Sequence, residues 1–408
     1  MRLIKDPNYK FAKIFLFSLL VVLALGSVFI YIIYDIKNSV KSPLFDGIID
    51  KDFSFIHRID KIHNGFILSG EDKVGAPILF KAIDNEKNEI WSKRISKKYL
   101  GDGYSFATEI KSYYILSSKD ETLFIDKKTH EISLRSKRKF NHIVPIDSKK
   151  SDEFFAAYGN NKVGKFNINK KIWGKGFSVG DVPKDYNIIY SRNIDNPQKI
   201  EQEITQVEPN LVVDIVKLNN GGVAVLASNG TIIEFDSFGK NFKVIQIPYY
   251  EDMVYYTNLI KIKDGYVTCR RGFNDISVVF MSENSSGDFE GTLRKFIKGQ
   301  TAGMPVAIAK FGDGYILGIN YENDAIVMFE LDEDFHFIKR YKIEKLPKMS
   351  VLKGILSLDN GSVLLYGARV NYQTPTPKMD FEGKWEDTFA EDGYKIDGFV
   401  INLHSKQL

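Results

Sequence analysis

The chain contains 408 residues, of which 44% are apolar and 13% aromatic, and its formal net charge is +4. This composition supports a large hydrophobic core and excludes an intrinsically disordered protein, which needs low hydrophobicity and high net charge. The single cysteine, Cys269, excludes an internal disulfide framework and a multi-cysteine metal site. Most of the basic excess lies in the first 13 residues. The nearly neutral remainder does not favour nucleic-acid binding, which depends on neutralising phosphates.

An uncharged apolar segment follows these basic residues. Residues 14–34 read IFLFSLLVVLALGSVFIYIIY, and at about 1.5 Å rise per residue a helix of this length crosses a bilayer core of roughly 30 Å. The positive-inside rule places residues 1–13 in the cytoplasm. We therefore predict a cytoplasmic segment at 1–13, a transmembrane helix at 14–34 and a linker at 35–50. The alternative is a signal peptide cleaved near Gly26, although the apolar run continues beyond that point.

From residue 51 onward one pattern recurs: an apolar strand, a polar turn that usually contains Gly, a second apolar strand, and a third strand. The first turns lie near residues 65, 112, 153, 221, 265, 314 and 361. Asn-Gly and Asp-Gly at five of them are strong hairpin signals, because primed turns need positive φ. The third strands are predicted at 77–84, 122–128, 163–169, 231–237, 277–283, 326–332 and 398–404.

A period of about 40–50 residues with up to four strands per unit is typical of a β-propeller. The chain is therefore predicted to be all-β, with a seven-bladed propeller at 51–408 preceded by the transmembrane helix. Six or eight blades are the alternative counts, and a sandwich or an irregular β-solenoid is the alternative architecture. The seventh unit lacks a fourth strand, which residues near 48–56 could supply to close the ring without an open edge.

One stretch of the first unit resembles the repeat of bacterial PQQ-like propellers. It is Ala82-Ile-Asp-Asn-Glu-Lys-Asn-Glu-Ile-Trp91, and residues 124–132 and 166–173 are weaker echoes. In those propellers an Asp ends one strand, a turn follows, and a Trp packs between blades. Most units here lack the Trp, and Asn88 stands where the turn usually has Gly. The resemblance implies an extracytoplasmic propeller, often a scaffold in envelope assemblies, and it supports architecture rather than activity.

No motif for catalysis, a cofactor or a metal is present in the sequence. The six histidines have no metal-ligand spacing, and HExxH, GxSxG and a phosphate-binding loop are missing. We expect these histidines to be solvated or in turns. The acidic turns at 101–103, 312–314 and 332–334 supply too few oxygens for calcium and are interpreted as ordinary turns. We therefore expect no catalytic, cofactor-binding or metal-binding residues, and no enzyme.

Two insertions interrupt the repeat, at about 174–209 and 370–395. The second contains large apolar side chains that a solvated loop does not need, among them Tyr372, Phe381, Trp385 and Phe389. Aromatic side chains on loops of a rigid scaffold are enriched at binding hot spots. These four residues are the candidate partner-binding site, and local packing on the propeller is the alternative interpretation.

These observations predict a membrane-anchored extracytoplasmic propeller that acts as a non-catalytic protein-interaction or scaffold module of the bacterial cell envelope. Its expected place is the inner membrane, as a single-pass protein with a cytoplasmic N-terminus and a periplasmic or extracellular C-terminal domain. The expected partners are the membrane and an envelope protein, without nucleic acid. The alternative function is a glycan-binding or hydrolytic propeller with a pocket at the central channel. Carboxylates and arginines converging on that channel would favour this alternative.

Overall fold

The computed structural model describes residues 45–72, 77–96, 106–117, 121–159, 162–169, 172–173, 177–178, 211–239, 242–247, 255–272, 275–283, 289–298, 303–321, 326–343, 346, 350–372 and 394–404. The predicted membrane segment at 14–34 lies outside these ranges. Within them, no helix has the length and hydrophobicity needed to span a bilayer. Residues 46–408 form one compact unit, which is the part discussed below.

The described strands form seven sheets, which we number as blades in chain order. Blade 1 consists of β2 (Phe53–Ile62), β3 (Gly65–Asp72), β4 (Pro77–Asp84) and β5 (Glu89–Ser96). Blade 2 consists of β6 (Phe106–Glu109), β7 (Tyr113–Ser117), β8 (Thr122–Asp126) and β9 (Ile132–Ser136). Blade 3 consists of β10 (Phe140–Pro145), β11 (Glu153–Tyr158), β12 (Lys162–Asn167) and β13 (Ile172–Trp173), with β14 (Phe177–Ser178) also paired to β12. Blades 4 and 5 consist of β15 (Val212–Lys217), β16 (Val223–Ala227), β17 (Thr231–Phe235) and β18 (Phe242–Gln246), and of β19 (Tyr255–Ile262), β20 (Gly265–Arg271), β21 (Asp275–Glu283) and β22 (Phe289–Lys298).

Blade 6 consists of β23 (Gly303–Phe311), β24 (Gly314–Tyr321), β25 (Val327–Leu331) and β26 (Phe337–Lys342). Blade 7 combines β27 (Val351–Ser357), β28 (Val363–Tyr372) and β29 (Tyr394–Leu403) with β1 (Phe45–Asp50) from the other end of the chain. The predicted closing segment, 48–56, overlaps β1, and its remainder begins blade 1. The last six residues of the predicted linker are therefore a strand of blade 7.

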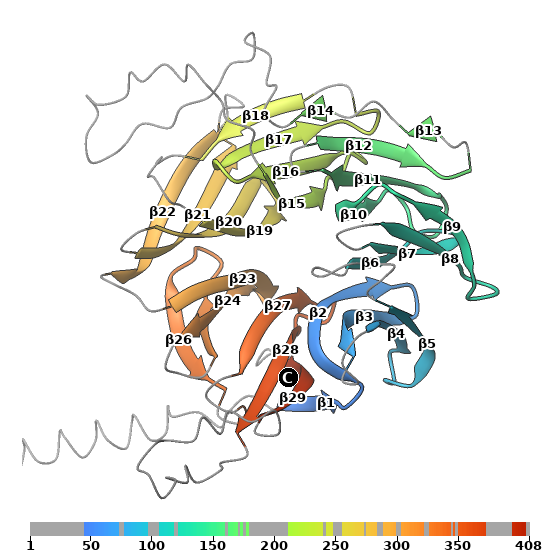
Figure 1. The fold of residues 1–408 in the computed structure, drawn as a ribbon. Helices are drawn as coiled ribbons and strands as arrows, with labels where there is room; N and C mark the ends of the chain where they lie inside the picture. Colours follow the sequence, from blue (N-terminus) through green and yellow to red (C-terminus); the bar gives the residue numbers. More distant parts are fainter. Residues whose placement is uncertain are drawn as a thin grey trace, which may run out of the picture. The chain divides into compact units, whose positions relative to one another are not determined.

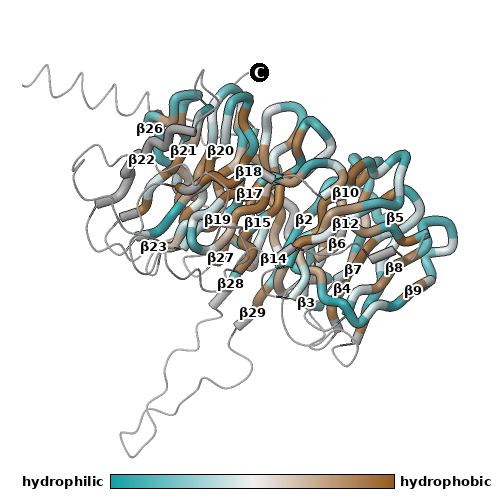
Figure 2. Tube along the Cα trace, turned by 90° about the horizontal axis from the view of Figure 1, so that it is seen from above, coloured by the Kyte–Doolittle hydropathy of each residue, from teal (hydrophilic) through white to brown (hydrophobic). Residues whose placement is uncertain are grey.

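The blades form a closed ring (Figure 1). The first strand of each blade contacts that of the next, and β27 of blade 7 contacts β2 of blade 1. This confirms the predicted seven-bladed propeller and the seven predicted first turns. Because both faces of a blade are covered by its neighbours, second strands such as β16 are buried throughout and read as continuous apolar runs. Figure 2 shows these hydrophobic residues within the strands and hydrophilic residues at the connections.

Glycine serves two different purposes at the first turns. At Gly221 φ is 82°, the positive value that the Asn-Gly signal predicts. At Gly265 and Gly314 the reason is space: a Cβ would lie 1.7 Å from the carbonyl oxygen of Met281 and 2.0 Å from that of Leu331. At these two turns the third strand approaches the start of the second so closely that only a residue without a side chain fits.

Amide side chains link neighbouring blades along the ring. Asn258 of blade 5 donates to the carbonyl of Ile308 in blade 6 at 2.8 Å and accepts from the amide of the same residue at 2.9 Å. Asn320 of blade 6 makes the same pair of hydrogen bonds with Leu352 of blade 7. Ile308 and Leu352 are buried. The two amides therefore pair backbone groups that would otherwise be buried without partners.

Candidate functional site at the ring closure

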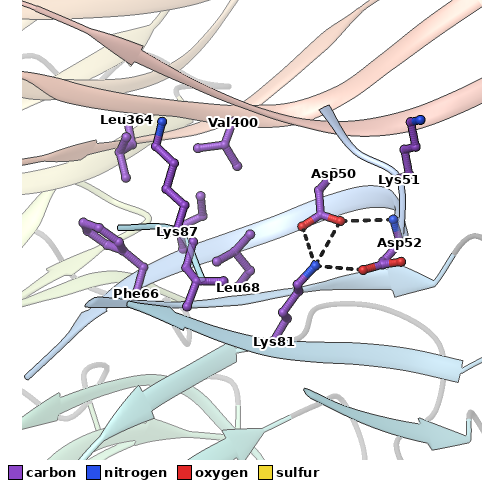
Figure 3. Close-up of a pocket in the computed structure, with 11 residues that line it drawn as sticks. Asp50, Lys51, Asp52, Phe66, Leu68, Lys81, Lys87, Leu364 and Val400 are labelled. Carbon is purple, nitrogen blue, oxygen red and sulfur yellow. Dashed lines mark hydrogen bonds and ion pairs between the residues drawn. The ribbon is translucent and has the colours of Figure 1, made fainter. Parts of the chain in front are cut away.

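The ring closes where β1 of blade 7 leads into β2 of blade 1. Lys81, on β4 of blade 1, lies 2.7 Å from the carboxylate of Asp52 and 3.2 Å from that of Asp50. Burial disfavours the charged form of Lys81, but its hydrogen bonds to the two carboxylates hold its pKa above the ordinary value. The hydrogen bond from Lys81 lowers the pKa of Asp52. This ionic group fastens the chain between β1 and β2 to blade 1 (Figure 3).

A pocket of about 290 Å³ lies beside this ionic group, between blades 1 and 7. We call it the seam pocket; it is lined by Asp50, Lys51, Asp52, Ile59, Phe66, Leu68, Lys81, Ile83, Lys87, Leu364 and Val400. Figure 3 shows Phe66 and Leu68 on the blade 1 side and Leu364 and Val400 on the opposite side. Six of the eleven lining residues are apolar and five are charged, so the pocket can bind a group that is apolar on one side and charged on the other.

Lys87 gives the seam pocket a cation that the described part of the chain does not pair. It lies in the turn between β4 and β5 with φ of 73°, a left-handed conformation uncommon outside glycine. The carboxylate of Asp84 holds this turn by accepting hydrogen bonds from the amides of Glu86 and Asn88 at 2.9 and 2.8 Å. Lys87 is exposed, and within the described residues its ammonium has no hydrogen-bond or ion-pair partner. The pocket can therefore receive an apolar group that carries a negative charge.

A second polar cluster lies on the innermost strands, at the central channel. Arg58 and Asp60 on β2 form a two-point ion pair, with N–O distances of 2.9 and 3.2 Å. The guanidinium of Arg58 also lies 3.9 Å from the ring centroid of Phe106 in blade 2. Burial raises the pKa of Asp60 despite the attraction of Arg58. The pair is thus partly desolvated, and the guanidinium of Arg58 connects blade 1 to blade 2.

Blades 3 and 4 add an imidazole and a carboxylate to this cluster. Nδ1 of His142 on β10 lies 3.5 Å from Asp214 on β15, and Asp214 also accepts a hydrogen bond from the amide of Leu259 in blade 5 at 2.9 Å. The negative charge of Asp214 contributes to the raised pKa of Asp60. The four side chains keep between 17% and 32% of their surface exposed. A carboxylate pair and an arginine therefore converge here within reach of solvent.

The structure corrects the expectation for two of the six histidines. His57 and His142 lie on the innermost strands β2 and β10, with side chains 15% and 21% exposed. Burial lowers the pKa of His57, and Glu71, at 3.4 Å, partly opposes this effect. His130 and His336 lie in turns as expected. The burial of these two histidines could not be predicted from the sequence, because a single histidine on a half-buried strand produces no periodic pattern.

The acidic turn at 332–334 is held by its own backbone. The carboxylate of Asp332 accepts hydrogen bonds from the amides of Asp334 and His336 at 2.9 and 2.7 Å. These bonds lower the pKa of Asp332, and they account for the turn without a bound ion. Across the described ranges, no group of three or more His, Cys, Asp or Glu side chains has a geometry that could hold a metal.

The predicted partner-binding residues lie mostly beyond the described part of the chain. Tyr372 ends β28, where its backbone pairs with Tyr394, while Phe381, Trp385 and Phe389 lie outside the described residues. That hypothesis stays a prediction. Sequence reasoning missed the seam pocket, because its lining comes from both ends of the chain. A blade-by-blade alignment would have shown Lys87 at the turn position that His130 and Phe335 occupy in blades 2 and 6.

Comparison with known proteins supports the fold and no particular family. No protein-family model and no curated protein matches the chain. The crystal structure of BamB from Moraxella catarrhalis, a PQQ-like propeller, matches with a TM-score of 0.50 at 11% identity, covering 90% of this chain and 99% of that one. The C-terminal WD40 domain of Sif2 matches with a TM-score of 0.50 at 8% identity, covering 86% of this chain and 81% of that one.

These two likenesses are equal in TM-score, so they do not single out the PQQ-like class. The repeat-level resemblance is nevertheless consistent with the structure. Trp91 is 7% exposed and lies between blades, with its ring centroid 5.0 Å from that of Tyr114 in blade 2. Asp84 ends β4 and caps the following turn, as the resemblance implies. The left-handed residue of that turn is Lys87 rather than Asn88, where the family usually has Gly.

Proposed function

We propose that this protein is a membrane-anchored propeller that acts as a non-catalytic protein-interaction or scaffold module of the bacterial cell envelope. The observation that carries the proposal is the seam pocket, a partly apolar recess lined by Lys87, whose ammonium has no partner within the described residues. The carboxylates of the pocket are paired with Lys81. Its lining supplies apolar surface and exposed lysines, while its two carboxylates are already paired, which suits docking of an acidic apolar group better than catalysis.

Crosslinking in intact cells tests the proposal. The full chain would be crosslinked in its native bacterium, purified and examined by mass spectrometry beside a variant that lacks residues 371–392. We expect one specific envelope protein with the wild-type chain. Its loss from the variant, with an unchanged melting temperature, would assign the contact to the second insertion. Recovery of no specific protein would contradict the scaffold proposal.

The anchor is the second part of the proposal, and the apolar segment 14–34 supports it. If the helix lies in the inner membrane and the propeller lies outside the cytoplasm, alkaline phosphatase fused to the C-terminus should be active. The fusion protein should also stay in the membrane fraction after extraction with alkaline carbonate. A fusion that lacks residues 1–40 should be inactive, because nothing would export it. Carbonate-soluble activity from the full-length fusion would instead indicate a cleaved signal peptide.

The channel cluster favours a second candidate, a propeller that binds a hydroxyl-rich ligand such as a glycan. Arg58, Asp60 and Asp214 supply donors and acceptors that remain partly exposed. Calorimetry with chito- and cello-oligosaccharides of about four to six units would test it. Binding that falls at least tenfold in Asp60→Asn, with the fold retained, would support this candidate. No binding or hydrolysis of either series would count against it.

A further inference from the structure

The blades are repeats, so the seam pocket can be compared with the same place at other junctions. In four blades an aromatic residue near the start of the second strand pairs with the penultimate or last residue of the first strand; the pairs are Phe66 with Lys61, Tyr114 with Glu109, Tyr266 with Lys261 and Tyr315 with Lys310. Each of these rings packs in the hydrophobic cluster shared with the preceding blade. They are therefore equivalent positions.

Three of these rings are covered by the chain itself. Tyr114 packs at a tilt against Trp91 of blade 1 at a centroid distance of 5.0 Å, Tyr315 stacks with Phe335 at 4.5 Å, and the hydroxyl of Tyr266 donates to Glu234 of blade 4. The exposed fractions of the three tyrosines are 7%, 6% and 0%. Phe66 is only partly buried and faces the seam pocket. It has no ring partner among the described residues.

The turn between the third and fourth strands explains the difference. In blades 1, 2 and 6 the backbone amide of one residue in this turn donates to the backbone carbonyl of the aspartate at the end of the third strand. The same residue has a positive φ, between 55° and 73°. These residues are Lys87, His130 and Phe335. Phe335 stacks its ring on Tyr315 at 4.5 Å, and His130 places its ring at a tilt beside Tyr114, 6.5 Å between centroids. In blade 1 the same position carries an ammonium, so no ring of the described residues covers Phe66 on the side of the seam pocket.

We propose that the seam pocket binds an aromatic side chain with a neighbouring carboxylate on a partner polypeptide, the ring packing on Phe66 and the carboxylate pairing with Lys87. This inference rests on the proposed function, since it names what the partner presents. The volume of about 290 Å³ exceeds the roughly 150 Å³ apolar cavity that takes a benzene ring. Asp50 and Asp52 are paired with Lys81, so the charges left without a partner among the described residues, those of Lys87 and Lys51, are positive.

Small probes test the pocket directly. The full chain in lipid nanodiscs would be titrated with N-acetyl-L-tryptophan and with its uncharged amide, using ligand-observed NMR and empty nanodiscs as background. An exposed charge pair is worth about a two- to fivefold difference in affinity, so the carboxylate form should bind that much more tightly. Lys87→Ala should equalise the two probes, and Lys128→Ala, which changes an exposed lysine in the equivalent turn of blade 2, should not.

Variants that fill the pocket with a larger side chain provide a second test. Lys87→Phe copies the arrangement of Phe335 in blade 6, so it should abolish binding of both probes and raise the melting temperature. Val400→Phe, which narrows the pocket from blade 7, should also abolish binding if Lys87→Phe proves poorly folded. Undiminished probe binding in a folded filling variant, or a carboxylate preference that survives Lys87→Ala, would overturn the inference.

Crosslinking in cells separates this inference from the scaffold proposal. If Lys87→Phe loses the partner that the wild-type chain captures, both stand. If Lys87→Phe retains that partner, the scaffold proposal stands and the pocket assignment fails. If the wild-type chain captures no partner while the probes bind as expected, the scaffold proposal fails and the pocket is a site for a free aromatic carboxylate.

Discussion

Deleting residues 1–50 is expected to destroy the cooperative fold of the propeller, although every residue from β2 onward is kept. The deletion removes β1, the outermost strand of blade 7, and with it the contact of Asp50 with Lys81. Several ladder hydrogen bonds at about 1 kcal/mol each, together with the apolar burial of the strand, make a loss of about 5 kcal/mol or more. The edge of β29 is then open to pairing between molecules.

The matched control deletes residues 1–40 and keeps β1. Circular dichroism melting and size-exclusion chromatography should show a cooperative monomer for this control. The longer deletion should melt well below it or elute as aggregates. Equal melting temperatures for the two deletions would mean that β1 does not close the ring, and the assignment of blade 7 would have to be revised.

Trp91→Ala is expected to produce the largest effect of any single substitution at a blade junction. The indole is 7% exposed and lies between blades 1 and 2, with its centroid 5.0 Å from Tyr114 and 5.8 Å from His130. Its removal leaves a cavity in a packed junction, which costs about 3–5 kcal/mol for a Trp-to-Ala change. Equilibrium unfolding in urea, followed by circular dichroism, measures this loss.

The neighbouring residue offers the control for Trp91. Ile90 is on the same strand but is 42% exposed, because adjacent residues of a strand point to opposite sides. Ile90→Ala should change the free energy of unfolding by less than about 1 kcal/mol. If both variants lose the same amount, the junction between blades 1 and 2 is not held by the indole. The proposed role of a ring in the equivalent space between blades 7 and 1 would then also weaken.

The polar cluster at the central channel and the cation of the seam pocket differ in how far the described residues pair them. Asp214 accepts a backbone amide of blade 5, and Arg58 is paired with Asp60, so much of the bonding capacity of the channel is used within the ring. Lys87, in contrast, has no partner in the described part of the chain. Lys87 is exposed to solvent, so its charge is available to an external ligand that also fills the apolar recess beside it.

The repeat could be predicted because its signals are local. Asn-Gly and Asp-Gly turns between apolar runs, recurring with one period, predicted the hairpins, and the third strand at 77–84 coincides with β4. Strand alternation was less informative, because both faces of the middle strands are buried. The boundaries of outer strands and the bulges of innermost strands could not be predicted, since they depend on the neighbouring blade.

Sequence alone therefore determined the all-β class and predicted seven blades and the closing role of the N-terminal end, because these follow from period, turn chemistry and a missing strand. The tertiary structure alone decided where function can reside. Phe66 and Lys87 lie near one end of the chain, and Leu364 and Val400 near the other. They meet only when the ring closes, and no local pattern records a contact between residues 277 to 334 positions apart. The side chains of Arg58 and Asp214 likewise converge because the innermost strands face one axis, which is a property of the closed ring.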